Sequence, residues 1–162
     1  MSIELKKIFL NDFHDVNNAK FIPFAGYSMP INYEEGIIKE HIQVRSLAGL
    51  FDVSHMGQIL VPVSELNILN LEKYIPLSIK KLKINKSYYT FILNDIGCVI
   101  DDIIFSKIIY NDKEFFFIVY NASRKEIDEN IFKEILSDYI FLNDNSLLAI
   151  QGPKAEEVIN FL

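Results

Sequence analysis

The feature that most constrains the fold is a strand-rich stretch in the second half of the chain, broken by two turn sequences. The runs Tyr88 to Leu93, Val99 to Lys107 and Glu114 to Tyr120 are rich in Ile, Val, Phe and Tyr, which favour strands. The tetrapeptides Asn94-Asp95-Ile96-Gly97 and Tyr110-Asn111-Asp112-Lys113 separate them, and Asn, Asp and Gly suit tight turns. The stretch therefore predicts an antiparallel meander.

A helix is expected well before this meander. Apolar residues recur at helical spacing from Asn32 to Leu47, and Asn32 with Glu35 three residues later resembles a capping box. Gly49 is placed to end that helix.

Two short strands joined by a polar loop are expected next. The segment Leu50 to Val63 is apolar and β-branched around Ser54-His55-Met56-Gly57, a pattern typical of strand, loop and strand. Ser64 can cap a short helix that Pro76 closes. The polar loop is the first candidate for chemistry.

The remainder of the chain also mixes helices and strands. Ser123 precedes a helical pattern that ends near Ile135, a strand pair is expected across Asn143-Asp144-Asn145, and Gly152-Pro153 is expected to open a last helix. Helices and strands interleave irregularly, so the predicted fold class is α+β, an antiparallel or mixed sheet with packed helices.

Composition excludes several classes of partner. The chain has 162 residues, a formal charge of -6 and no block of Lys or Arg, so we expect no nucleic acid and no membrane as partner. Cys98 is the only cysteine, which precludes an intramolecular disulfide, and Met1 to Lys7 resembles neither a signal nor a transit peptide. We therefore expect a cytoplasmic protein.

Metal, nucleotide and hydrolase chemistry also lack support. His14, His41, His55 and Cys98 show no metal-ligand spacing, so no metal is predicted. The six glycines form neither a dinucleotide fingerprint nor a phosphate loop. Asp52, Ser54 and His55 are adjacent in sequence without a nucleophile elbow, so a hydrolase triad is rejected, and His55 is expected to make structural hydrogen bonds more readily than to act as a base.

Three segments carry recognisable motifs: Phe21 to Pro30 (FIPFAGYSMP), Gly49 to Gly57 (GLFDVSHMG) and Gly97 to Asp102 (GCVIDD). In order and spacing they resemble the motifs PFAGW-x-MP, GLFDVSHMG and GG-x-I/L-DD of the glycine cleavage system T-protein, the aminomethyltransferase family. Asn121-Ala122 and Ala149 to Pro153 are supporting matches, so the resemblance covers nearly the whole chain. It implies the N-terminal portion of the T-protein folate-binding fold over residues 1–162.

The resemblance also implies a function and a set of site residues. Family members are transferases of one-carbon metabolism and glycine catabolism that pass the methylene of an aminomethyl group, carried on lipoylated H-protein, to tetrahydrofolate and release ammonia. Positive charge develops at an iminium-like carbon, which a fixed carboxylate would stabilise. By resemblance that catalytic carboxylate is Asp102, while Met56, Tyr89 and Asn121 line the folate. Asp101 would point to the opposite face of a strand and is interpreted as structural.

The chain departs from the family pattern at several points. Tyr27 replaces the usual tryptophan, and Cys98 replaces the second glycine of the GG pair, so we expect an altered turn there. The pterin-gripping glutamate, a cofactor-site arginine and the C-terminal domain have no counterpart, and the last apolar helix, from Pro153 to Leu162, ends without a cap. An incomplete active site is therefore expected.

Alternative functions remain open from sequence. The leading interpretation is the N-terminal portion of an aminomethyltransferase, with weak or no turnover expected of this chain alone. The alternative is a non-catalytic fragment or subunit of a split T-protein whose C-terminal half is a separate partner. Folate-dependent demethylases and the tRNA-maintenance folate protein share the scaffold.

Overall fold

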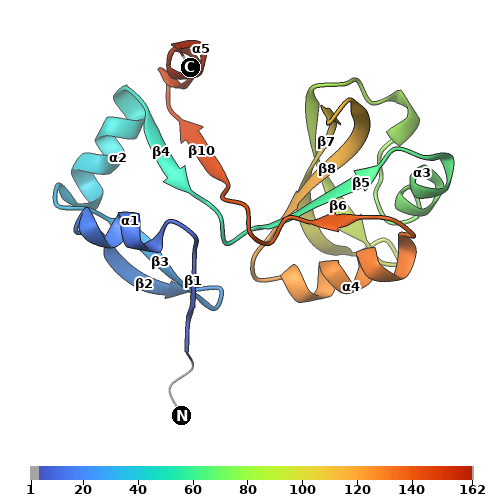
Figure 1. Cartoon of the computed structure of the whole chain (residues 1–162), viewed down its shortest axis with the longest axis horizontal. Coiled ribbons are helices and arrows are strands. Elements are labelled where there is room, and N and C mark those ends of the chain that lie inside the picture. The colour runs from blue at the N-terminus through green and yellow to red at the C-terminus, as the bar shows by residue number, and fades with distance from the viewer. Residues whose placement is uncertain (1–3, 162) are drawn as a thin grey trace. The chain divides into compact units, whose positions relative to one another are not determined.

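The computed structural model describes residues 4–161 and is drawn in Figure 1. The chain divides into two compact units, the first comprising the residues up to His55 and those from Asp144 onward, and the second Met56–Asn143. Helices and strands interleave in both, which confirms the expected α+β class. Within residues 4–161 no helix combines the length and the apolar character needed to cross a membrane.

An antiparallel sheet forms the second unit. Its strand order is β6-β7-β8-β5-β9, and every neighbouring pair is antiparallel. The strands are β5 (Gly57–Pro62), β6 (Lys86–Leu93), β7 (Val99–Tyr110), β8 (Lys113–Tyr120) and β9 (Ile140–Phe141). The predicted meander is therefore confirmed as β6, β7 and β8, with β7 three residues longer than expected.

The two hairpin turns have the backbone conformations that their residues favour. Asn111 and Asp112 adopt φ of 49° and 60° between β7 and β8, the left-handed pair of a two-residue hairpin. In the turn before β7 the left-handed residue is Gly97, at φ 79°. Cys98 needs no positive φ, and its backbone N–H donates to Asn94 Oδ1 at 2.8 Å, so the expected disturbance at Cys98 does not arise.

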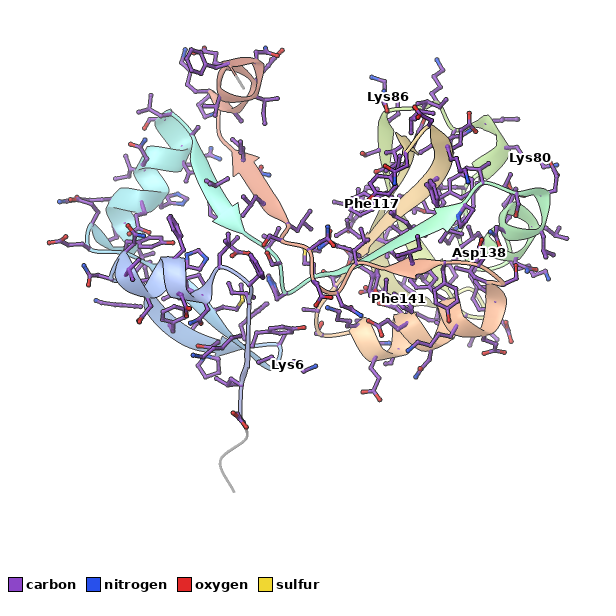
Figure 2. All side chains as sticks on the ribbon, viewed as in Figure 1. Lys6, Lys80, Lys86, Phe117, Asp138 and Phe141 are labelled. Carbon is purple, nitrogen blue, oxygen red and sulfur yellow. The ribbon has the colours of Figure 1, made fainter. Side chains whose placement is uncertain are left out.

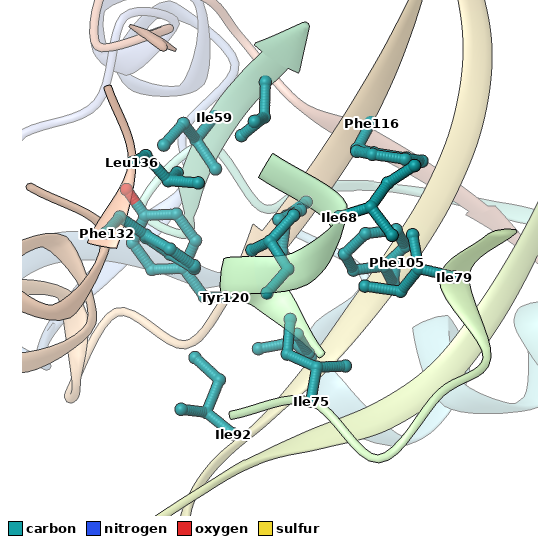
Figure 3. Packing of buried hydrophobic residues seen from close by; sticks show 14 residues of the cluster. Ile59, Ile68, Ile75, Ile79, Ile92, Phe105, Phe116, Tyr120, Phe132 and Leu136 are labelled. Carbon is teal, nitrogen blue, oxygen red and sulfur yellow. The ribbon is translucent and has the colours of Figure 1, made fainter. Parts of the chain in front are cut away.

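The hydrophobic core lies on one face of this sheet. Side chains alternate along a strand, and Ile103, Phe105 and Ile118 point to the face that packs against α3 (Glu65–Leu71), the short helix η1 (Ile79–Lys81) and α4 (Lys125–Ile135). Figure 3 shows Phe132 of α4 beside Tyr120 of β8, with ring centroids 5.4 Å apart. The helices α3, η1 and α4 therefore all pack on the same side of the sheet.

Ser64 begins α3 as the sequence predicted. Its Oγ accepts a hydrogen bond from the backbone N–H of Asn67 at 3.1 Å, which satisfies one of the free donors at a helix start.

The opposite face of the sheet is more open. Tyr89, Phe91, Asp102 and Ile104 share it by strand register, and Phe117, labelled in Figure 2, belongs to the same face. Tyr89 is 67% exposed and Ile104 43% exposed. This face therefore presents aromatic and acidic side chains away from the helices of its own unit.

The first unit contains two small sheets and the remaining helices. One sheet has the order β1-β3-β2 and the other pairs β10 with β4. The elements are β1 (Lys6–Lys7), α1 (Asn11–Val16), β2 (Lys20–Phe24), β3 (Tyr27–Asn32), α2 (Gly36–Ser46), β4 (Gly49–Asp52), β10 (Leu148–Gln151) and α5 (Ala155–Phe161). The expected helix after Gly152-Pro153 is confirmed as α5, and Leu162 lies outside the described residues.

Two local predictions in this unit were wrong. The helix α2 begins at Gly36, because Asn32 is the last residue of β3 and Glu35 makes no side-chain capping bond. Gly49 opens β4, since α2 already ends at Ser46.

The strand pair expected across Asn143-Asp144-Asn145 was also wrong. The strands on either side join different sheets: β9 pairs with β5, and β10 pairs with β4. Partners distant in sequence therefore outcompete the short local hairpin.

Candidate functional site

Strand register brings three of the four predicted site residues to one end of the sheet in the second unit. Tyr120, the last residue of β8, pairs with Ile103 of β7 and with Gly57 of β5. Asn121 follows Tyr120, Asp102 precedes Ile103 and Met56 precedes Gly57, so these three residues continue the same row. Because β5 and β7 both run antiparallel to β8, the residue that follows β8 lies beside the residues that precede its partners on the two neighbouring strands.

Asn121 is held by two neighbouring aspartates. Its Nδ2 donates to Asp101 Oδ1 at 3.0 Å, to Asp102 Oδ1 at 3.1 Å and to the backbone oxygen of Asp102 at 3.0 Å. Its backbone N–H donates to Asp101 Oδ2 at 3.0 Å. Three acceptors around one atom fix that atom as the amide nitrogen. The Oδ1 end of the amide is therefore the end directed away from the aspartates.

Tyr89 completes this group from β6. Its hydroxyl donates to Asp102 Oδ2 at 2.8 Å, and its ring meets that of Phe91 edge-on at 5.7 Å. The hydrogen bond to Asp102 raises the pKa of Tyr89, with smaller contributions from desolvation and from the charges of Asp102 and Asp101. Tyr89 thus remains a proton donor at neutral pH.

Tyr89, Asp102 and Asn121 are called the Asp102 cluster below. Each carboxylate oxygen of Asp102 accepts a hydrogen bond, Oδ1 from Asn121 and Oδ2 from Tyr89. Two donors, one in β6 and one directly after β8, restrict the carboxylate to one orientation, which is the arrangement that electrostatic stabilisation of a developing cation requires. Asp102 is half-buried, so a ligand on the open face can reach it.

Asp101 lies on the opposite face, as strand alternation predicted. It is 5% exposed and bound to Asn121. Its carboxylate therefore supports the Asp102 cluster from the core side.

Met56 and Gly57 lie where the polar loop enters β5. Met56 is half-buried, and no hydrogen bond or ring contact places it more closely than the strand register does. A Cβ on Gly57 would lie 1.9 Å from the Tyr120 ring, so glycine is required for the close approach of β5 to β8 at this end of the sheet.

Hydrogen bonds within the first unit hold Asp52 and Ser54, at the start of the polar loop. Asp52 accepts a hydrogen bond from the backbone N–H of Ser54 at 2.9 Å and meets His14 Nε2 at 2.9 Å. The backbone N–H of Leu147 donates to Ser54 Oγ at 2.9 Å. Asp52 therefore orients His14.

His55 packs against aromatic rings of the same unit. The rings of Phe24 and Tyr27 meet it nearly edge-on, at 5.5 Å and 6.2 Å. Tyr27, which stands where the family usually has tryptophan, thus contributes an aromatic surface to His55.

Sequence reasoning missed two buried polar groups. One is His14, which lies between Tyr33 Oη at 2.6 Å and Asp52 Oδ2 at 2.9 Å. The other is Asp128, fully buried in α4. Asp128 lies four residues before Phe132, on the apolar stripe of its helix, so a carboxylate at a core position was the available signal.

A groove of about 520 Å³ lies in the first unit. Tyr33, Glu40, His41 and Phe51 are among the residues that line it. None of the predicted site residues belongs to its lining. Among residues 4–161 there is also no group of three or more His, Cys, Asp or Glu side chains arranged to hold a metal ion.

The fold and the site together define an α+β protein with a hydrogen-bonded carboxylate at the end of an antiparallel sheet. The family model of the GCVT N-terminal domain matches residues 10–162, and the chain therefore belongs to this family.

Named relatives agree with the family model. The chain is 43% identical to an aminomethyltransferase of Thermoanaerobacter pseudethanolicus, over 98% of this chain and 43% of the relative. It is 34% identical to a mitochondrial aminomethyltransferase of Dictyostelium discoideum, over 98% of this chain and 41% of the relative. The chain thus spans less than half the length of these curated relatives.

A solved structure has the same fold. The crystal structure of glycine cleavage system aminomethyltransferase T from Bartonella henselae superposes with a TM-score of 0.86 at 34% identity, covering 98% of this chain and 44% of that one.

Proposed function

We propose that this chain supplies the folate-binding face and the catalytic carboxylate of an aminomethyltransferase of the glycine cleavage system. The reaction transfers the methylene of an aminomethyl group on lipoylated H-protein to tetrahydrofolate and releases ammonia. The observation that carries the proposal is the Asp102 cluster, in which Tyr89 and Asn121 hold one carboxylate at the open face of the sheet. The names of the relatives supply the class of reaction.

The donor and acceptor set suits a folate. In the reaction the methylene carbon leaves its sulfur and its nitrogen and bonds two amine nitrogens of the folate, whose protons end on the thiol and on ammonia. Asn121 Oδ1 is an acceptor for a pterin N–H, while Met56 and the exposed ring of Tyr89 are apolar surfaces for a flat heterocycle. The cluster and the loop thus offer both polar and stacking contacts.

Asp102 would stabilise the positive charge that develops in the transfer step. Positive charge develops at the carbon that is transferred, and a carboxylate already oriented by two hydrogen bonds stabilises it without reorganising. Asn121 and Tyr89 would position the carboxylate and the ligand, which is the geometric part of the catalysis. We also propose that the reaction takes place in the cytoplasm, where the exposed thiol of Cys98 would stay reduced.

The test uses anaerobic calorimetric titration of tetrahydrofolate into the chain, together with an assay of aminomethyl transfer from H-protein. Asp102→Asn keeps the size of the side chain and removes its charge, so we expect folate binding to persist and transfer to fall by about 100-fold or more. Asp95→Asn, at an exposed aspartate in the turn before β7, is the matched control and should behave as wild type.

Two results would contradict the proposal. Transfer at the wild-type rate in Asp102→Asn would remove the catalytic role of this carboxylate. A folded wild-type chain that does not bind tetrahydrofolate would show that the Asp102 cluster and Met56 do not make a sufficient folate site.

A further inference from the structure

A second acidic residue lies behind the Asp102 cluster, in the core of the same unit. Asp128 of α4 is 0% exposed, and neither of its carboxylate oxygens has a hydrogen-bond donor. A fully buried carboxylate without donors is strongly disfavoured as an anion. Asp128 is therefore expected to hold a proton unless a cation compensates it.

The carboxyl of Asp128 interacts with that of Asp101, which is also buried. The Asp101 side chain is close enough to Asp128 to raise its pKa through hydrogen bonding and charge, and a hydrogen bond between two carboxyl groups needs a proton on one of them. Asp101 uses both of its oxygens to accept hydrogen bonds from Asn121. The shared proton therefore belongs to Asp128, which donates it to Asp101.

The charged neighbours of this pair are Arg124, directly before α4, and Glu129 of α4. Burial is the main cause that raises the pKa of Asp128 to about 8, followed by the hydrogen bond to Asp101 and by the charge of Asp101. Arg124 lowers this pKa and Glu129 raises it. Glu129 in turn accepts a hydrogen bond from Tyr120 Oη at 3.3 Å.

We propose that protonated Asp128 is a positioning residue, which fixes Asp101 and through it the amide of Asn121. The hydrogen bonds then run in one direction: Asp128 donates to Asp101, Asn121 donates to both Asp101 and Asp102, and Tyr89 donates to Asp102. The amide nitrogen of Asn121 is thereby held toward the aspartates, and its Oδ1 is presented to the ligand.

Loss of the proton from Asp128 undoes this arrangement. Two carboxylates would then face each other in the core, with only Arg124 to offset their repulsion. Asp101 would shift, and the Asn121 amide would lose one of its fixed acceptors. The proton sharing follows from the fold of this unit alone, whereas its effect on folate binding rests on the proposed function.

The first experiment is an NMR titration from about pH 6 to about pH 9.5, which covers the range in which Asp128 should lose its proton. It follows the side-chain carboxyl carbon of Asp128 and the side-chain amide signals of Asn121. In the wild type both should change together, with one midpoint above neutral pH. An Asp128 carboxyl already ionised at about pH 6, or Asn121 signals that do not follow it, would overturn the proposal.

Two variants and a control distinguish a positioning role of Asp128 from a purely structural role. Asp128→Asn can still donate to Asp101 but cannot titrate, so the Asn121 signals should stay near their low-pH positions throughout. Asp128→Ala removes the donor and should displace them at every pH. If Asp128→Ala fails to fold, the comparison of Asp128→Asn with wild type still shows whether the Asn121 signals depend on the Asp128 proton. Asp138→Asn, at an exposed aspartate labelled in Figure 2, should titrate as wild type.

The second experiment measures tetrahydrofolate affinity over the same pH range. Wild-type affinity should fall by about tenfold above the midpoint, and the affinity of Asp128→Asn should not. Equal pH dependence in the two proteins would overturn the positioning role. Failure of both proteins to bind tetrahydrofolate would contradict the proposed function instead, because the NMR titration tests the Asp101–Asp128 pair without ligand.

Discussion

The buried carboxyl of Asp128 should make the stability of the second unit fall as pH rises. Its pKa in the folded chain is raised from the model-compound value of 3.8 to about 8. The folded state thus favours the protonated form, and this contribution is fully present below about pH 4 and is lost as pH rises through about 8. At about 1.36 kcal/mol for each pKa unit, the total loss is at most roughly 6 kcal/mol.

Asp128→Asn isolates this contribution, because asparagine keeps the shape and a donor but does not titrate. The free energy of unfolding of the variant, relative to wild type, should increase by about 1.3 kcal/mol per pH unit between about pH 5 and about pH 7.5. That amounts to about 3 kcal/mol over the interval. Groups that do not interact with Asp128 contribute equally to both proteins and cancel in the difference.

The assay is urea unfolding followed through NMR amide signals of β7 and β8, so that only the second unit is measured. Asp138→Asn, at an exposed site, should run parallel to wild type at every pH. If the curves of Asp128→Asn and wild type are parallel instead, Asp128 carries no proton in the folded chain, and the reasoning from burial fails.

Three further substitutions test the packing that positions the site. Gly57→Ala places a methyl group 1.9 Å from the Tyr120 ring and should lower the unfolding free energy by roughly 2 kcal/mol or more, with an unchanged value contradicting the close approach. Phe132→Ala, at a core side chain 1% exposed, should cost roughly 3–5 kcal/mol in urea unfolding. His14→Ala removes the partner of Oδ2 of the buried Asp52 carboxylate and should cost about 3 kcal/mol, measured in the first unit by the same method.

The core of the second unit was largely predictable from local patterns. The meander residues alternate in character, and Asn111-Asp112 and Gly97 adopt the positive φ values that their residue types allow. The helix cap at Ser64 was also predicted from local sequence and is confirmed. These features succeed because each depends on residues close together in the chain.

The errors arose where distant segments compete with local ones. Asn32 and Glu35 have the spacing of a capping box, but pairing of β3 with β2 retains Asn32 in the strand. The residues around Asn143-Asp144-Asn145 suggested a hairpin, but β9 and β10 each gain a longer-range partner. A one-dimensional pattern does not contain these alternative partners.

The candidate site divides in the same way. Motif resemblance alone named Asp102, Met56, Tyr89 and Asn121 as site residues, and their roles remain predictions. The hydrogen bonds that join three of them depend on the register of β6, β7 and β8. Asp128 lay within a helical pattern that the sequence made plain, yet its importance depends on the neighbouring Asp101.

The sequence by itself determined the α+β class, the meander with its turns, and the residues that carry the family motifs, because these follow from local propensity, alternation and residue identity. Only the tertiary structure decided which strands pair across the chain and that the buried carboxyl of Asp128 interacts with Asp101. The reason is that hydrogen-bond geometry and burial depend on groups far apart in sequence, which meet only when the sheet and α4 are packed together.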